Sequence, residues 1–483
     1  MAQTRFSDLR RVKPIDLIMK QSGDKKHGLK RTLNAFSITL LGIGAIVGTG
    51  IFVLTGVAAA KYAGPGLIFS FILAGIVSGL AALCYAEFAS TVPISGSAYT
   101  YSYATLGELI AWIIGWDLIL EYAVGAGAVA IGWSGYIVDL LKSAFGIVIP
   151  KAFTESPFSG GIVNLPALLI IFLVTALLVL GTSESTIVNN IMVGVKLAVI
   201  VFFLIIGFGH INAANWQPFL PFGVGGIFRG ASVIFFAYIG FDQISTSAEE
   251  TKNPARDLPI GIFVSLFVCT ALYIAVTVVL TGVVSYKQLN VASPVSHALI
   301  LLGLNTAGAI ISVGAVCGLT TVLIVLLYGQ SRIFFAMARD GLLPRIFSRV
   351  HPRFRTPYIS SLLVGLFVAL IAGFIPIDVV AELTNIGTLA AFILVSAAVL
   401  ILRRTQPDLR RGYRVPLVPF LPILSIIASV VLIFSLPVVT LGRFVIWLAL
   451  GLLVYFVYSK RKSHLEPGVI PPPEEEEAAI GDA

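Results

Sequence analysis

The chain contains 483 residues, of which 57% are hydrophobic and only 12% are charged, and its formal net charge is +8. Soluble domains carry about 25% charged residues, so this composition excludes a soluble globular protein and indicates that lipid is the solvent. The positive charge does not indicate nucleic-acid binding, because the basic residues lie in short segments between apolar runs rather than on one basic face.

Twelve apolar runs follow one another along the chain, and their lengths suit membrane-spanning helices, which need about 20 residues. The run at 305–337 is long enough to contain a kink or to extend beyond the membrane. We therefore expect an all-α polytopic membrane protein with twelve transmembrane helices. The runs lie at 36–58, 66–90, 108–141, 163–182, 187–208, 226–248, 259–285, 305–337, 358–375, 379–402, 417–438 and 442–459.

The basic residues are distributed unequally between the two sides of the predicted membrane. With a cytoplasmic N-terminus, 25 of the 32 lysine and arginine side chains fall on the cytoplasmic side, so both termini are expected there. The basic segment 1–35 lacks the pattern of a cleaved signal peptide; within it, Pro14–Gln21 is either a short amphipathic helix on the inner leaflet or a solvated segment. The tail 460–483, with Pro471–Glu477, is expected to be disordered.

The first run is rich in glycine at the depth of the membrane centre. It contains Gly42, Gly44, Gly48 and Gly50, and each glycine in a helix interior costs about 1 kcal/mol relative to alanine. Close helix packing through the pair Gly44 and Gly48 is one interpretation. The alternative is an interrupted helix whose exposed amides line a cavity, because unpaired backbone is tolerated at that depth only there.

The sixth run is interrupted as well, by Gly240 and Asp242, and an ionisable residue near the middle of a span indicates a functional site. Each interrupted run opens a block of five spans. This spacing is typical of an inverted repeat with a binding site at the membrane midplane. The expected domains are a first repeat at 36–208, a second repeat at 224–402 and two further helices at 417–459.

The motifs of these segments resemble those of the amino acid-polyamine-organocation superfamily of transporters, and within it bacterial amino acid permeases related to cationic amino acid transporters. The resemblance covers nearly the whole chain and depends on Gly48–Phe52, Phe236–Asp242, Glu249–Pro259, Arg332–Pro344 and Lys196. It implies a LeuT-like five-plus-five inverted repeat with broken first and sixth helices. It also implies a secondary active transporter of cationic or small neutral L-amino acids in the plasma (inner) membrane, and not an enzyme.

Broken helices suit a zwitterionic amino acid, because their free amides bind a carboxylate and their free carbonyls bind an ammonium group. The resemblance also implies that Phe236 closes over the substrate as a gate, although a core aromatic residue is an equal interpretation. For the carboxylate we expect the amides near Thr49 and Gly50, with Ile46 and Gly48 lining the break, and for the ammonium the carbonyls of Phe236, Ala237 and Ile239.

Lys196 lies in the middle of the fifth run, too deep to reach either interface readily. Desolvation penalises a buried ammonium group, so this lysine is expected to bind and release the coupling proton. In related proton-coupled transporters such a lysine resembles a fixed cation where sodium-coupled relatives bind an ion. The alternative is a permanently charged lysine that tethers the fifth helix to carbonyls of the first. Transport is accordingly expected to be proton-coupled symport, independent of sodium.

The substrate side chain is expected to meet the third and eighth helices. Glu121 follows Asp117 by one helical turn and faces the same side. It either receives a cationic side chain or relays a proton, or it is simply buried against neighbouring helices. By resemblance the pocket also includes Thr321 and Leu326. The sequence leaves the choice between cationic and neutral substrates open.

Other protein classes are disfavoured. Gly132–Gly135 imitates the serine motif of an intramembrane hydrolase, but the five histidines lie outside or near the ends of the spans, so a base is missing. A channel would need repeated rings of charges or carbonyls. Exchange of amino acids against polyamines remains an alternative to symport. No metal or cofactor is expected, because the three cysteines lie inside apolar runs and zinc motifs are absent.

Overall fold

The computed structural model describes residues 11–12, 33–91, 97–180, 186–242, 244–245, 248, 251–354 and 356–463. All secondary-structure elements among these residues are helices, apart from one isolated bridge between Leu33 and Thr251. The all-α prediction is thereby confirmed. The predicted helix Pro14–Gln21 and the tail Pro471–Glu477 lie outside the described residues.

Each apolar run of the sequence contains a helix. The apolar helices are α3 (Ala35–Ile46), α5 (Leu67–Thr91), α7 (Glu108–Phe145), α8 (Leu165–Leu180), α9 (Thr186–Phe208), α10 (Gly223–Ile234), α11 (Pro254–Val283), α13 (Asn305–Arg339), α14 (Tyr358–Phe374), α15 (Ile377–Thr405), α16 (Phe420–Phe434) and α17 (Val438–Val454). Short helices connect them, among them α6 (Ser97–Thr105), α12 (Pro294–Leu301) and α18 (Lys460–Lys462).

Seven helical stretches of the described residues are long and apolar enough to cross a membrane, and five shorter apolar helices have 10–17 residues. These lengths are consistent with a polytopic membrane protein, whereas the number of twelve spans and the inverted repeat stay predictions. The long run at 305–337 forms one continuous helix, α13, of 35 residues. At about 1.5 Å per residue this helix is longer than the bilayer core of about 30 Å, which is consistent with an extension beyond the membrane.

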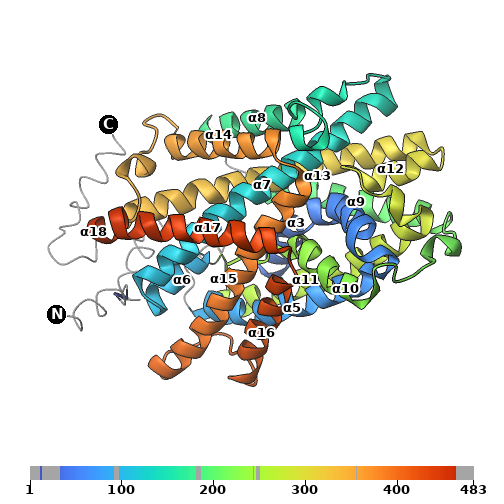
Figure 1. Ribbon diagram of the computed structural model, residues 1–483. Helices are drawn as coiled ribbons and strands as arrows, with labels where there is room; N and C mark the ends of the chain where they lie inside the picture. The colour runs from blue at the N-terminus through green and yellow to red at the C-terminus, as the bar shows by residue number, and fades with distance from the viewer. Residues whose placement is uncertain are drawn as a thin grey trace.

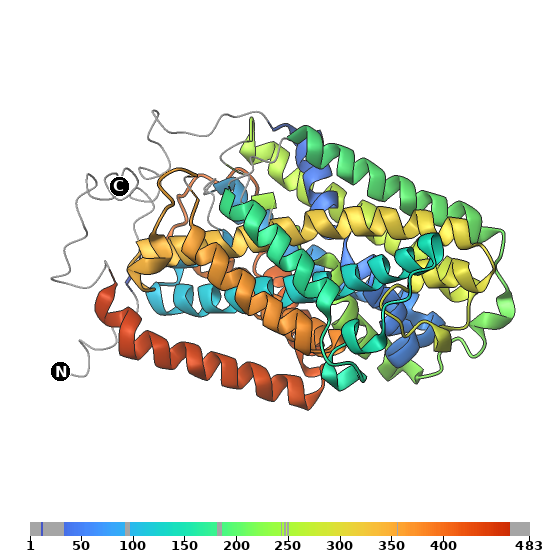
Figure 2. The same ribbon diagram turned by 90° about the horizontal axis from the view of Figure 1, so that it is seen from above.

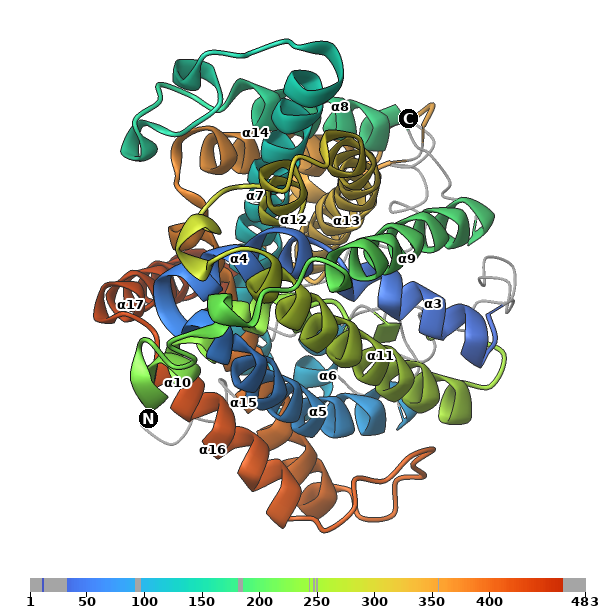
Figure 3. The ribbon, with the colours of Figure 1, turned by 90° about the vertical axis from the view of Figure 1, so that its right-hand side faces the viewer.

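The long helices run alongside one another in a single bundle (Figures 1 and 2). Viewed along the bundle, α7 and α13 lie near α8 and α14, whereas α5 and α11 lie in the opposite half (Figure 3). In the most apolar window of α7, 78% of the residues are buried, against 22% in Val438–Lys462. The helix α7 is therefore central, and α17 lies at the periphery, where it presents its apolar side chains outward.

The described chain ends meet at one end of α7. The amide of Glu108 donates to the carbonyl of Arg11 at 2.8 Å, and the hydroxyl of Ser463 donates to the Glu108 carboxylate at 2.5 Å. Tyr455 donates to the other oxygen of that carboxylate at 3.1 Å. The first and last described segments thus lie on the same side of the bundle.

The first and sixth apolar runs, in which the sequence pattern indicated an interruption, do not form continuous α-helices in the structure. Helix α3 ends at Ile46, Val47 is extended with ψ 97°, and a π-helical turn, Gly50–Leu54, resumes the chain. In the sixth run, α10 ends at Ile234 and a 3₁₀ turn, Phe235–Tyr238, follows.

The sequence predicted a sixth run that continues to residue 248, but the described residues beyond 240 form only short 3₁₀ pieces. Gly240 explains the change of direction, because its φ of +119° is a conformation that other residues rarely adopt. A Cβ at this position would also lie 2.9 Å from the carbonyl carbon of Ala45, so the second break packs directly on the end of α3.

Candidate functional site

The two breaks contact each other in the middle of the bundle. A Cβ built on Gly50 would lie 2.3 Å from the Cα of Ala237, so only glycine permits this approach. On the other side of the first break, a Cβ on Gly48 would lie 3.1 Å from Val322 of α13. The structure therefore brings the predicted residues of the first and sixth helices together.

The first break carries free hydrogen-bond donors. Among the backbone hydrogen bonds of turns, loops and caps in the described part of the chain, none has the amide of Gly48 as its donor. The hydroxyl of Thr49 is also without a partner there, although the residue is only 1% exposed. Buried polar groups are normally paired. These donors at the start of a helical turn are thus suited to an anion such as a carboxylate.

The carbonyls of the breaks are held by Tyr273 of α11. Its hydroxyl lies 2.9 Å from the carbonyl oxygen of Ile46 and 2.6 Å from that of Ala237. The carbonyl of Phe236 accepts from the amide of Ile239 at 3.2 Å. Two of the carbonyls predicted to bind an ammonium group therefore already have one partner, and each oxygen keeps a second lone pair.

Lys196 of α9 is fully buried against the first break. Its Nζ donates to the carbonyls of Gly44 at 2.7 Å and Val47 at 3.1 Å, both at the end of α3. The contact corresponds to the tether considered from the sequence. It satisfies carbonyls that the end of α3 would otherwise leave unpaired.

A side chain that sequence reasoning missed, Asn385 of α15, holds the second break. Its amide donates to the carbonyls of Ser232 and Val233, both at 2.7 Å, near the end of α10. The Oδ1 atom of Asn385 has no partner among the described residues, although the residue is fully buried. A polar residue inside an apolar run was the only available sequence signal.

One face of α7 borders the site. A Cβ on Gly132 would lie 3.5 Å from the methyl group of Thr49, next to the first break. Two turns earlier, a Cβ on Gly125 would lie 3.8 Å from Leu326 and 3.9 Å from the ring of Phe236. Leu326 and Phe236 therefore both lie beside Gly125, and both are buried. Gly125 was not identified from the sequence, where it looks like one small residue among many.

Glu121 lies one turn further along this face and is 3% exposed. Thr388 of α15, Asp117 and Asp242 are all close enough to the Glu121 carboxyl group to interact with it electrostatically. Thr321, in contrast, donates its hydroxyl to the carbonyl of Gly318 at 2.7 Å, within its own helix.

Both ends of α15 are tied to other helices by charged groups. At one end, Lys61 pairs with Asp378 at 2.9 Å. The hydroxyls of Tyr62 and Thr440 bind the Glu382 carboxylate at 3.3 and 2.6 Å. Lys61 and Tyr62 follow the first break along the chain, so this group connects the first helix to α15.

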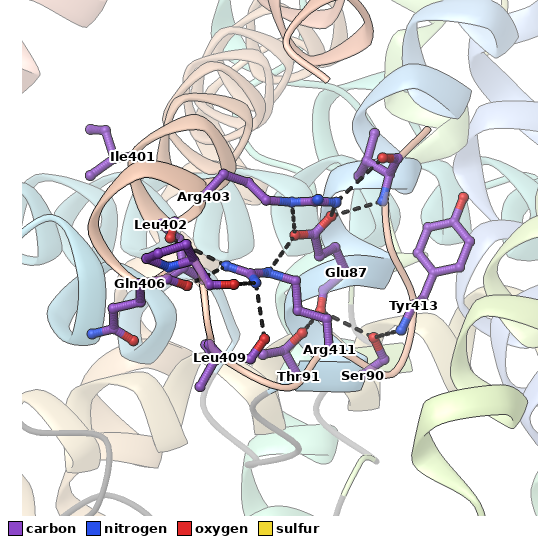
Figure 4. Close-up of polar contacts among 12 residues, drawn as sticks. Glu87, Ser90, Thr91, Ile401, Leu402, Arg403, Gln406, Leu409, Arg411 and Tyr413 are labelled. Carbon is purple, nitrogen blue, oxygen red and sulfur yellow. Dashed lines mark hydrogen bonds and ion pairs between the residues drawn. The ribbon is translucent and has the colours of Figure 1, made fainter. Parts of the chain in front are cut away.

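At the other end, Glu87 of α5 binds two arginines, and we call Glu87, Arg403 and Arg411 the Glu87 cluster (Figure 4). Arg403 donates to both carboxylate oxygens at 2.8 Å, and Arg411 lies 3.2 Å from one of them. The amide of Val415 also donates to Glu87 at 2.8 Å. The opposite charges of the loop Glu249–Pro259 and of Arg332 and Arg339 suit either an inner ion-pair gate or a solvated loop, and Glu249 lies outside the described residues.

Residues 33–457 match the protein family described as amino acid permease. The methylthioribose transporter of Bacillus subtilis is 52% identical over 95% of this chain and 100% of its own length. The branched-chain amino acid permease BcaP of Bacillus subtilis is 52% identical over 93% of this chain and 97% of its own length. A vacuolar cationic amino acid transporter 4 of Arabidopsis thaliana is 39% identical over 83% of this chain and 68% of its own length.

Proposed function

Because the chain belongs to the amino acid permease family, whose members are transporters and not enzymes, we propose that it moves L-amino acids across the plasma membrane by proton-coupled symport with alternating access. The observation that carries this proposal is the contact between two helix breaks, at Gly50 and Ala237, in the middle of an apolar bundle. Unpaired backbone at that depth is tolerated where it lines a binding site.

The substrate carboxylate binds the amides of Thr49 and Gly50, with Ile46 and Gly48 beside it. The N-terminal end of a helical turn carries partial positive charge, which favours an anion there. The unpaired and buried hydroxyl of Thr49 adds a further donor. A bound carboxylate would satisfy groups that otherwise remain unpaired at a cost of about 1–3 kcal/mol each.

The ammonium group binds the carbonyls of Phe236, Ala237 and Ile239 at the second break, and the ring of Phe236 covers the substrate as a gate. Tyr273 keeps the carbonyls of Ile46 and Ala237 at a fixed separation. In this proposal the carboxylate of the amino acid binds the first break and its ammonium group binds the second. The hydroxyl of Tyr273 contacts carbonyls of both breaks.

Lys196 couples transport to protons. It is fully buried, and its Nζ donates to two carbonyls at the end of α3, next to the proposed carboxylate position. Loss of its proton would remove the positive charge and leave an amine with two N–H groups, so the hydrogen bonds to the carbonyls of Gly44 and Val47 would lose their charge assistance and weaken. Protonation is thereby linked to the geometry of the first break.

Alternating access opens one end of the bundle at a time. The Lys61–Asp378 pair closes the outer end and the Glu87 cluster closes the inner end, with both termini in the cytoplasm. In this proposal the helices form two inverted repeats, 36–208 and 224–402, which are followed by two further helices at 417–459. The segments 1–35 and 460–483 at the two ends of the chain lie in the cytoplasm.

Methylthioribose is a second candidate substrate, because the transporter of that name in Bacillus subtilis matches 95% of this chain over its own full length. It has no carboxylate for the amides of Thr49 and Gly50, so the free donors of the first break favour an amino acid.

Uptake into proteoliposomes tests the proposal. Radiolabelled L-leucine, L-alanine and L-lysine are supplied under an inward proton gradient, with methylthioribose and putrescine as competitors. We expect saturable amino acid uptake with counterflow, driven by the proton gradient and unaffected by a sodium gradient. In a parallel assay with labelled methylthioribose, uptake that amino acids do not inhibit would contradict the substrate assignment. Flux without counterflow would indicate a channel.

A further inference from the structure

The segment that connects α15 to α16 presents positive charge on its outer side, and we call residues 403–416 the arginine segment. Figure 3 shows it at the periphery of the bundle, beside α16. Arg404, Arg410 and Arg414 are exposed, and none of their guanidinium groups has a hydrogen-bond or ion-pair partner among the described residues. Asp408 is the one acidic residue between 403 and 416, so an excess of positive charge faces outward.

The backbone of the arginine segment is fixed from the inside (Figure 4). The amide of Tyr413 donates to the hydroxyl of Ser90 on α5 at 2.9 Å, and a Cβ on Gly412 would lie 2.6 Å from Ala255. The exposed arginines therefore have their positions set before a ligand binds, which reduces the entropy lost on binding. The buried guanidinium group of Arg411 donates at 2.8–3.3 Å to the carbonyls of Leu402, Gln406, Pro407 and Leu409.

An apolar surface begins directly beyond the arginine segment. Leu417 and Phe420 are both more than half exposed. Leu417 also has a φ of +48°, a conformation that glycine or asparagine adopts at lower cost. An exposed leucine in this turn is better suited to lipid than to water. The exposed apolar side chains continue along one stripe of α16, at Ile423, Ile427, Val431 and Phe434.

The change from arginine to apolar side chains between Arg414 and Leu417 matches the boundary between lipid head groups and the hydrocarbon core. Basic residues lie at this boundary on the cytoplasmic side of membrane proteins, and basic sites between helices there bind anionic head groups. A guanidinium group can donate two parallel N–H bonds to one phosphate, so arginine suits such a site better than lysine does.

We propose that Arg404, Arg410 and Arg414 bind the phosphate of an anionic phospholipid whose acyl chains lie against Leu417 and Phe420. The proposed function does not assign this site. The inference takes from it only the cytoplasmic position of the chain ends, which places the lipid in the inner leaflet. A zwitterionic head group binds more weakly, because its own ammonium group compensates the phosphate charge.

The lipid acts on the Glu87 cluster through the neighbouring arginines. Arg411 follows Arg410 and lies 3.2 Å from the Glu87 carboxylate. Arg403 and Arg414 are close enough to Arg411 to interact with it electrostatically, and these like charges repel one another. A bound phosphate offsets part of this repulsion, so anionic lipid stabilises the cluster.

Native mass spectrometry of the purified full-length protein in detergent measures the lipid affinity. The probes are dioleoylphosphatidylglycerol, which is anionic, and dioleoylphosphatidylcholine, which is zwitterionic. Each arginine near an anionic lipid surface contributes about 5-fold to binding. The triple variant Arg404→Gln, Arg410→Gln and Arg414→Gln should therefore bind phosphatidylglycerol about 100-fold more weakly than the wild type.

The matched control is a second triple variant, Arg345→Gln, Arg349→Gln and Arg353→Gln. It removes the same charge from exposed arginines of the segment that follows α13, and it should keep the wild-type affinity. Size-exclusion profiles verify folding. If the first triple variant does not fold, Arg410→Gln and Arg414→Gln are measured singly, and each should lose about 5-fold in affinity for phosphatidylglycerol.

The inference is overturned if the wild type binds phosphatidylglycerol no more tightly than phosphatidylcholine. It is also overturned if the first triple variant keeps its affinity, or if both triple variants lose the same affinity. Inorganic phosphate that displaces the lipid at equal concentration would assign the site to a free anion and would equally contradict the proposal. None of these results bears on amino acid transport, which the uptake assay tests separately.

Discussion

Gly50 and Ala237 are in direct contact, since a Cβ on Gly50 would lie 2.3 Å from the Cα of Ala237. The two residues come from the first and sixth apolar runs, and their contact closes the site between the breaks. A larger side chain at position 50 must separate these segments or occupy the proposed position of the substrate carboxylate.

Gly50→Leu should abolish amino acid binding while the protein still inserts in the membrane. A ligand at 100 times its Kd stabilises a wild-type protein by about 2.7 kcal/mol, and this stabilisation should be absent in the variant. Thermal unfolding of the purified protein with and without substrate measures it. Gly442→Leu is the control, because that glycine on α17 is exposed and has no neighbour within 4 Å of an added Cβ. Normal substrate stabilisation of Gly50→Leu would contradict the site.

Lys196→Met should uncouple transport from protons. The variant keeps a long buried side chain but loses both donations to the end of α3. Uptake driven by an inward proton gradient should fall to the level measured without a gradient. Lys151→Met, at an ion pair in which the lysine side chain is 63% exposed, should leave coupling unchanged. If a sodium gradient drives uptake by the wild type after the pH gradient is collapsed, proton coupling is wrong.

Tyr273→Phe should weaken the arrangement of the two breaks. The substitution leaves the carbonyls of Ile46 and Ala237 without their hydroxyl partner, at a cost of about 1–3 kcal/mol per buried unpaired group. We expect a lower melting temperature and a higher KM for the amino acid. Tyr286→Phe serves for comparison, because the hydroxyl of Tyr286 binds no other described residue. An unchanged KM would show that the breaks keep their positions without this bridge.

Glu87→Gln should destabilise the protein more than Arg403→Gln does. The Glu87 side chain is 1% exposed and holds two arginines, whereas that of Arg403 is 23% exposed. Removing one partner of a buried ion pair costs about 3–5 kcal/mol, because the remaining charge stays buried. Chemical or thermal unfolding in detergent compares the two single variants with the double variant. Additive effects in this comparison would mean that the two residues do not act as a pair.

The helix breaks were predictable from the sequence because glycine and aspartate are costly inside apolar helices, and the structure confirms interruptions after Ile46 and Ile234. Tyr273 and Asn385 were not predictable in this way. Each is an ordinary residue of its own helix, and its role arises from carbonyls far away in the chain. Gly125 was missed for a different reason: only the measured space around it distinguishes it from the packing glycines of α7.

The charges that tie α15 also match the polarity of the helix itself. Asp378 lies in its first turn and Arg403 in its last. The peptide dipoles of a helix favour a negative charge near its N-terminus, where Asp378 lies, and a positive charge near its C-terminus, where Arg403 lies, by about 0.3–1 kcal/mol each. When Lys61 moves away from Asp378, or Glu87 from Arg403, the charge that remains on α15 therefore lies at the end of the helix that stabilises it. Separation of each pair is cheaper than it would be for the same charges reversed, and in the proposed alternating-access cycle this would lower the barrier to switching between the two open states.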